Sequence, residues 1–165
     1  MRLTAILLST VFVMTLGTAI NAKDEGSFSG KWVLDKSTER SSNTPVNLVS
    51  KIKQDGSRVT IESTFKEPEN GVVPLLYLGV MTTNLKLSLD GDTQQNQIGP
   101  FQMASKTTMN GNQMETEWTA EVKGDQVQGH WTHTLDPDGK HMTLAIKESS
   151  KEGQGGEATL HFVRK

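Results

Sequence analysis

Residues 113–122 have the sequence QMETEWTAEV, in which apolar and polar side chains largely alternate. In an extended chain Met114, Trp118 and Val122 share one face, and the glutamates fall on the other. Alternation with a period of two is the pattern of a strand that buries one face. The stretch therefore predicts a half-buried β-strand, and the Asn110-Gly111 pair just before it predicts a hairpin turn.

The same pattern recurs along most of the chain, and turn-forming residues such as Asp136-Pro137-Asp138-Gly139 separate its segments. Many short strands in succession predict an all-β sandwich or barrel. Only one face of each segment is apolar, which argues against a parallel sheet covered by helices on both sides. We expect about nine strands, at 28–34, 46–54, 57–66, 84–90, 100–109, 112–122, 126–135, 140–148 and 157–164.

Alternation in these strands also predicts a single apolar core. Each large side chain that becomes buried stabilises the fold by roughly 1.5–3 kcal/mol, so this set dominates folding. The predicted core holds Phe28, Trp32, Leu34, Leu48, Ile52, Val59, Ile61, Leu85, Leu87, Leu89, Phe101, Met103, Met114, Trp118, Val122, Val127, Trp131, Leu135, Met142, Leu144, Ile146, Leu160 and Phe162.

Two segments do not alternate. Residues 72–81 are apolar, and Pro74 argues against a central strand there. This segment is interpreted either as a plug that covers an edge of the core or as a lid over a ligand. Residues 147–156 are polar and glycine-rich, and we interpret them as a hairpin tip that carries no chemistry.

The first 22 residues have the layout of a secretory signal peptide. Arg2 precedes a mostly apolar run over 3–16, and the small residues Gly17, Ala19 and Ala22 follow. The prediction is a cleaved leader at 1–22 and one β-barrel domain over 23–165, with an uncleaved anchor as the alternative. We therefore expect no integral membrane span after cleavage, and a protein exported to a periplasm or cell exterior, in a bacterium.

The composition excludes several kinds of binding partner and covalent attachment through cysteine. The formal net charge is −2, which leaves no basic footprint for nucleic acid or for an acidic membrane surface. The chain has no Cys, so neither disulfides nor lipid attachment through a cysteine can hold it. Aromatic residues make up only 5% of the chain, which argues against a broad sugar-stacking surface.

Arg164, near the end of the chain, shares a strand face with Leu160 and Phe162. An inward Arg is costly unless it is paired or lies over an aromatic ring. If the last strand meets the first, Arg164 can cover Trp32, which faces inward on the first strand. The alternative is a solvated arginine at a frayed end.

Gly30-Lys31-Trp32 together with Arg164 resembles the lipocalin-like (calycin) barrels, which carry a Gly-x-Trp on the first strand and a late Arg that packs across the Trp. The resemblance implies a single antiparallel up-and-down β-barrel of about 8–10 strands, and a family role that is often the holding of small apolar molecules. The second lipocalin motif, which contains a Tyr, has no match, since Tyr77 is the only tyrosine. The opening 28–37 also resembles small, mostly uncharacterised exported bacterial proteins of lipocalin-like type.

Polar residues on the inward face are candidates for a ligand site. Small barrels either fill their interior or enclose a ligand, and ligand pockets are apolar with a few placed polar groups. The alternative is that these polar groups bond to backbone or water. The predicted lining holds Trp118, Trp131, Met103 and Met114, with the polar residues Ser50, Ser63, Ser105, Thr107, Thr116 and His133.

No metal site, cofactor site or catalytic residue is predicted. His130 and His133 would point to opposite faces of one strand, so they cannot share an ion. Asp136-x-Asp138-Gly139 lacks the further ligand positions of a calcium loop, and a turn explains it. The hydrolase elbow Gly-x-Ser-x-Gly is absent.

Three functions remain open. The first is an exported carrier that buries a small hydrophobic molecule in its barrel. The second is a ligand-free envelope interaction or inhibitor module that works through its surface. The third, supported least, is an enzyme on the same barrel with His133 as its base.

Overall fold

The computed structural model describes residues 26–36, 38, 44–66, 77, 79–80, 84–153 and 155–165. The predicted leader at 1–22 lies outside these residues. The predicted plug or lid at 72–81 also lies mostly outside them, because only Tyr77, Gly79 and Val80 are described there. Within the described residues, no helix is long and apolar enough to cross a membrane.

The described chain is all-β and forms one ten-stranded antiparallel sheet of up-and-down topology. The predicted all-β, lipocalin-like barrel is therefore confirmed. Its strands are β1 (Gly30–Leu34), β2 (Val46–Asp55), β3 (Arg58–Lys66), β4 (Leu85–Ser88), β5 (Gln94–Ile98), β6 (Phe101–Asn110), β7 (Gln113–Val122), β8 (Asp125–Leu135), β9 (His141–Ser150) and β10 (Gly155–Arg164).

Strand β5 is the one that alternation does not predict. Its sequence, QQNQI, is dominated by amide side chains, which are poor strand formers. It nevertheless pairs with β6 from Gln94↔Ser105 to Ile98↔Phe101. The neighbouring strand therefore holds this segment in the sheet, although its own composition gives little signal.

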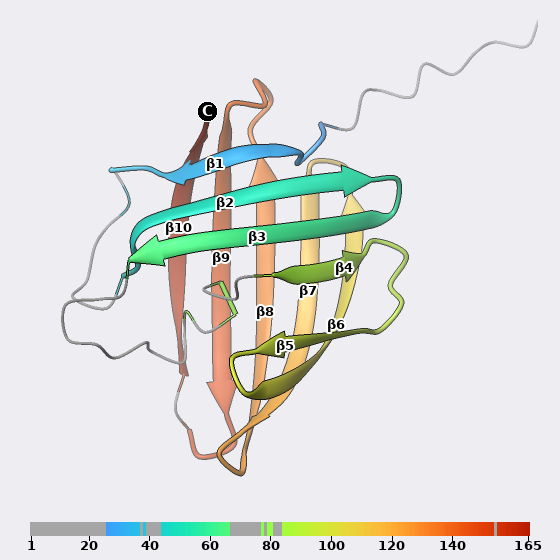
Figure 1. Cartoon of the computed structure of the whole chain (residues 1–165), viewed down its shortest axis with the longest axis vertical. Coiled ribbons are helices and arrows are strands. Elements are labelled where there is room, and N and C mark those ends of the chain that lie inside the picture. The colour runs from blue at the N-terminus through green and yellow to red at the C-terminus, as the bar shows by residue number, and fades with distance from the viewer. Residues whose placement is uncertain are drawn as a thin grey trace, which may run out of the picture.

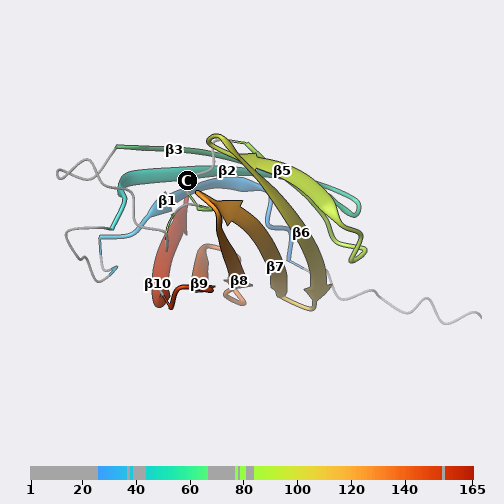
Figure 2. The same cartoon turned by 90° about the horizontal axis from the view of Figure 1, so that it is seen from below.

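The sheet curls until its two layers face each other. The strand order is β4-β3-β2-β1-β10-β9-β8-β7-β6-β5, so the first strand pairs with the last in the middle of the sheet. Figure 1 shows β1–β3 crossing in front of the steep strands β6–β10. In Figure 2, viewed from below, the same two layers enclose the interior. The result is a nearly closed barrel.

Tight hairpins set the register between neighbouring strands. The β7–β8 pairing ends at Val122↔Asp125, and Lys123 and Gly124 form the turn. Both turn residues have positive φ, 55° and 87°. This is the requirement of a type I′ turn, whose twist matches that of the flanking strands. The register so fixed keeps Trp118 and Trp131 on the inner face.

The barrel closes between β4 and β5 without a ladder of backbone hydrogen bonds, since these strands stand at the two ends of the sheet order. One side chain spans this seam. The Asn96 carboxamide accepts from the backbone N–H of Lys86 at 2.7 Å and donates to the Lys86 carbonyl at 2.8 Å. It also donates to Ser105 Oγ at 3.2 Å. Asn96 therefore replaces one pair of ladder bonds.

The core occupies the space between the layers, as alternation predicts. Three predicted members, Leu89, Phe101 and Val122, are only partly buried, because they lie at or beyond strand ends where the layers no longer cover them. Three residues that are not in the predicted core list, Tyr77, Ile98 and Ala120, are buried as well.

Candidate ligand-binding site in the barrel interior

The first and last strands meet at an aromatic site, where Arg164 Nε is a buried polar atom without a hydrogen-bond partner among the described residues. Trp32 pairs with Arg164 across β1 and β10, and the Arg164 guanidinium lies 4.6 Å from the centroid of the Trp32 ring. The indole Nε1 of Trp32 donates to the carbonyl of Phe28 at 2.8 Å. Arg164 Nη2 donates to the carbonyl of Ser27 at 2.7 Å. Gly30 lies against the Arg164 side chain and has a φ of 151°, a backbone conformation that residues with a side chain rarely adopt.

All residues predicted to line a ligand are buried, including the six polar ones. Most of those polar groups bond to each other across strands. The hydroxyls of Ser50 and Ser63 are 3.1 Å apart. Those of Thr107 and Thr116 are 3.0 Å apart. These two pairs are therefore satisfied by each other, and not by backbone or water as the alternative expects.

An internal cavity of about 20 Å³ lies between the two layers, room for about one water molecule. Four of the predicted lining residues border it: Ser50, Ser63, Trp131 and His133. Trp118, Met103, Met114, Ser105, Thr107 and Thr116 do not border this cavity. The structure therefore divides the predicted set into a group around the cavity and a group elsewhere in the packed core.

Part of the cavity wall comes from the connection between β3 and β4. Gly79 and Val80 line the cavity, and Tyr77 is buried beside them in the core. A β-carbon on Gly79 would overlap Cζ2 and Cη2 of Trp131, so the backbone of Gly79 lies directly on the indole. A ligand larger than one water molecule must therefore compete with Gly79 and Val80 for this space.

His133 is a neutral imidazole at physiological pH. Burial lowers the pKa of His133 to about 4, because the charged form loses its solvation. Its ring stands edge-on to Phe28, with centroids 6.4 Å apart. Its Nδ1 has no hydrogen-bond partner among the described residues. A catalytic base would need a nucleophile within hydrogen-bond reach, and none contacts this nitrogen in the described part of the chain.

A second polar cluster lies in the interior around Glu148 of β9. Glu148 is 2% exposed, and the indole Nε1 of Trp131 donates to its Oε1 at 3.3 Å. Burial raises the pKa of Glu148 to about 7, although the hydrogen bond from Trp131 opposes the shift. Trp118 packs against Trp131 with ring centroids 5.4 Å apart.

Two polar atoms of this cluster have no partner among the described residues: Trp118 Nε1 and Glu148 Oε2. The two residues flank Gly129, which pairs with Trp118 on one side and with Glu148 on the other. A β-carbon on Gly129 would overlap the Trp118 indole, so this glycine lets the ring lie across β8 toward Glu148. Buried polar groups are almost always satisfied, so two open ones together are unusual.

Glu148 is absent from the predicted lining, although the signal for it was present. Met142, Leu144 and Ile146 alternate inward on β9, and one further step reaches Glu148. The interpretation of residues 147–156 as a hairpin tip without chemistry is wrong at this position, because β9 continues to Ser150.

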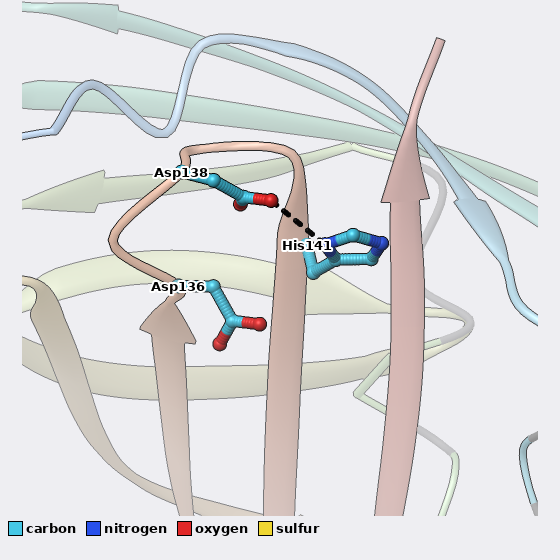
Figure 3. A group of neighbouring side chains, drawn as sticks. All are labelled: Asp136, Asp138 and His141. Carbon is cyan, nitrogen blue, oxygen red and sulfur yellow. Dashed lines mark ion pairs between the residues drawn. The ribbon is translucent and has the colours of Figure 1, made fainter.

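A possible cation site lies on the β8–β9 turn. His141 joins Asp136 and Asp138, and one ligand atom from each lies within 4.8 Å of the others (Figure 3). His141 supplies the third donor that the turn sequence lacks. All three residues are exposed, and His141 Nδ1 already contacts Asp138 Oδ2 at 3.3 Å. A turn hydrogen bond from the Lys140 N–H to Asp138 Oδ1 explains the geometry without an ion.

The outer face of β6–β9 carries a separate open hollow of about 590 Å³. A row of polar side chains crosses it in register: Lys106, Glu117, His130 and Lys147. Lys147 continues the row to Glu157 of β10 through an ion pair of 2.7 Å. These side chains are exposed, as expected for a solvated face.

Comparison with known proteins identifies the fold. No protein-family model matches the chain, and the search of curated proteins found no match. Two similar solved structures are secretory abundant heat soluble (SAHS) proteins from Ramazzottius varieornatus. The first has a TM-score of 0.57 at 12% identity, over 84% of this chain and 95% of that one. The second, protein 4 of that name, has a TM-score of 0.50 at 13% identity, over 83% and 94%. At this identity the likeness shows the lipocalin-like barrel alone.

Proposed function

We propose that this protein binds one small amphipathic molecule inside its barrel. The observation that carries the proposal is a group of three buried polar atoms without a partner among the described residues, at His133, Trp118 and Glu148; a fourth such atom, Arg164 Nε, lies at the contact between β1 and β10. Each such group costs about 1–3 kcal/mol of stability when it stays unsatisfied. A core built only for packing has no reason to keep them, whereas a ligand with a polar group supplies the missing bonds.

The surroundings of these atoms suit an apolar body. Trp131 borders the cavity with Ile52, Leu144 and Phe162, and the edge of its indole lies against Gly79. Gly79 and Val80 belong to a connection outside the strands, so they can yield this space without breaking a ladder. We therefore place the apolar part of the ligand against Trp131, in the position that Gly79 and Val80 now share.

Export is part of the proposal and rests on the signal-like residues 1–22. The two structural neighbours are called secretory in their own descriptions, and we extend that word to this chain only as a proposal. The expected place of action is a periplasm or the cell exterior.

The test is uptake of the apolar dye N-phenyl-1-naphthylamine by the purified protein. We expect its fluorescence to rise and saturate at one dye per chain. Gly79→Val should increase the affinity, because the added side chain cannot remain against Trp131 and the space opens. The control is Thr64→Val, which keeps the size of the side chain and lies on the exposed outer face of β3. A folded wild type that takes up no dye would contradict the proposal.

A second function is favoured by one observation. The described interior leaves only about 20 Å³, whereas the outer hollow over β6–β9 measures about 590 Å³. A filled barrel that acts through this outer face would be an interaction or inhibitor module. It would take up no dye, and Gly79→Val would destabilise it without any gain in binding, so the same experiment separates the two functions.

A further inference from the structure

The polar group of the ligand can be inferred from the two open atoms beside Gly129. The Trp118 indole N–H only donates hydrogen bonds, and a carboxyl oxygen accepts them or, when protonated, donates. Trp118 and Glu148 flank Gly129 in register, and because Gly129 has no side chain the Trp118 indole occupies the space over β8. A ligand atom at this place meets one fixed donor and one carboxyl oxygen.

Few head groups satisfy both partners. An ammonium has no lone pair and leaves the Trp118 N–H open. A carboxylate accepts from Trp118 but repels an ionised Glu148. A hydroxyl accepts from Trp118 while it donates to Glu148 Oε2, and it can also accept from Glu148 when the acid is protonated. A hydroxyl therefore fits both protonation states of the acid.

We infer that Trp118 and Glu148 form a subsite for one hydroxyl group, so that the preferred ligand is a neutral amphiphile ending in an alcohol. Trp131 joins this subsite to the apolar space. Its Nε1 donates to Glu148 Oε1 and thereby holds the carboxyl group, while its Cζ2 and Cη2 edge lies against Gly79. A ligand whose chain replaces Gly79 and follows the Trp131 ring brings its end toward Glu148.

This inference rests on the proposed function and deepens it. The test is displacement of bound N-phenyl-1-naphthylamine by three amphiphiles of equal chain length: 1-decanol, decanoate and decylamine. Wild type should bind 1-decanol most tightly. Glu148→Leu and Trp118→Phe should each weaken 1-decanol about tenfold relative to the dye, the equivalent of one hydrogen bond.

Two variants serve as controls. Glu148→Gln keeps an oxygen that accepts from Trp131 Nε1 and places an N–H donor at the open position. A hydroxyl can accept from this N–H and from the Trp118 N–H together, so the binding of 1-decanol should be retained. Glu117→Leu removes a carboxyl group from the exposed outer face of β7 and should change nothing. Both control for the loss of a carboxyl group as such.

The outcomes distinguish the two levels of the proposal. Equal binding of 1-decanol by wild type, Glu148→Leu and Trp118→Phe would overturn the subsite and leave the proposed function standing, with a buried water as the partner of both atoms. Tighter binding of decylamine or decanoate than of 1-decanol would overturn the hydroxyl assignment. Failure of the dye itself to bind would contradict the proposed function.

Discussion

Two buried tryptophans of this barrel sit in opposite electrostatic situations. Trp32 is 0% exposed, its N–H donates to Phe28, and Arg164 covers its face. Trp118 is 2% exposed, yet its N–H has no partner in the described part of the chain, and the nearby Glu148 also has an open oxygen. The site at Trp32 joins the first and last strands, although Arg164 Nε has no partner among the described residues, whereas at Trp118 we propose that a ligand supplies the missing partner.

The largest expected effect breaks the closing site. Trp32→Ala removes a buried indole and strips Arg164 of the ring that it covers, and should cost about 3–5 kcal/mol of unfolding free energy. Trp118→Phe removes only an unpaired N–H and part of the ring, and should cost less than about 1.5 kcal/mol. Urea denaturation measures both. Equal losses would contradict the distinction between the two tryptophans.

The free energy of unfolding should depend on pH because of Glu148. The pKa of Glu148 is raised to about 7, so the folded state holds a proton that the unfolded state releases near its ordinary pKa of 4.5. The stability contributed by the protonated acid is therefore complete below about pH 4.5 and is lost as pH rises through 7. The loss is roughly 3 kcal/mol.

Glu148→Gln has no such proton and should not show this loss. The gain in stability of Glu148→Gln over wild type should therefore grow from near zero at pH 4.5 to roughly 3 kcal/mol at pH 8. Urea midpoints at a series of pH values measure this difference. A constant difference across that range would show that Glu148 is solvated in the native protein.

His133 should act in the opposite direction. The pKa of His133 is lowered to about 4 in the folded chain. The unfolded chain therefore binds a proton near pH 6.5, whereas the folded chain binds it only near pH 4. The stability that this neutral histidine contributes is present above pH 6.5 and is lost as pH falls through 4. Wild type should therefore lose roughly 2 kcal/mol by pH 5 relative to His133→Gln. Comparison with His130→Gln, on the exposed face of β8, controls for histidine loss. Parallel pH profiles for wild type and His133→Gln would contradict the burial of a neutral imidazole.

The smallest effect concerns the two seams of the barrel. The β1–β10 seam is a backbone ladder, whereas the β4–β5 seam depends on Asn96. Asn96→Leu should cost about 1.5 kcal/mol and speed hydrogen exchange at the Lys86 amide. Gln95→Leu, on the outer face of β5, should leave that amide unchanged. Slow exchange at Lys86 in Asn96→Leu would show that other contacts hold the seam.

The sequence predicts most of the barrel because most of its strands can be recognised from their own residues. Alternation in β7 and β9 marks the inner face, and Gly-containing turns mark the hairpins. Strand β5 and its inward Asn96 were not predicted, because amide side chains give no apolar period. The partner of Asn96 is the Lys86 backbone ten residues earlier, on a strand that stands at the other end of the sheet order. The local pattern shows which face of a strand is buried, whereas the residues that pair across strands are known only once the fold is known.

The interior site was only partly predictable for the same reason. Burial of Trp118, Trp131 and His133 follows from alternation, but the absence of a partner for an indole N–H does not. Glu148 lies one more step of alternation along β9, but it was not recognised as an inward residue because it is polar. The separation of the Ser50 and Ser63 pair from the open atoms at Glu148 depends on register across several strands, which no single segment encodes.

The most direct test of the central claim is native mass spectrometry of the folded protein with equimolar 1-decanol. We expect one molecule to be retained per chain in wild type and in Glu148→Gln, and to be largely lost from Glu148→Leu. Two results would contradict the claim that Trp118 and Glu148 bind the ligand: a folded wild type that retains no 1-decanol, or equal retention of 1-decanol by wild type and Glu148→Leu.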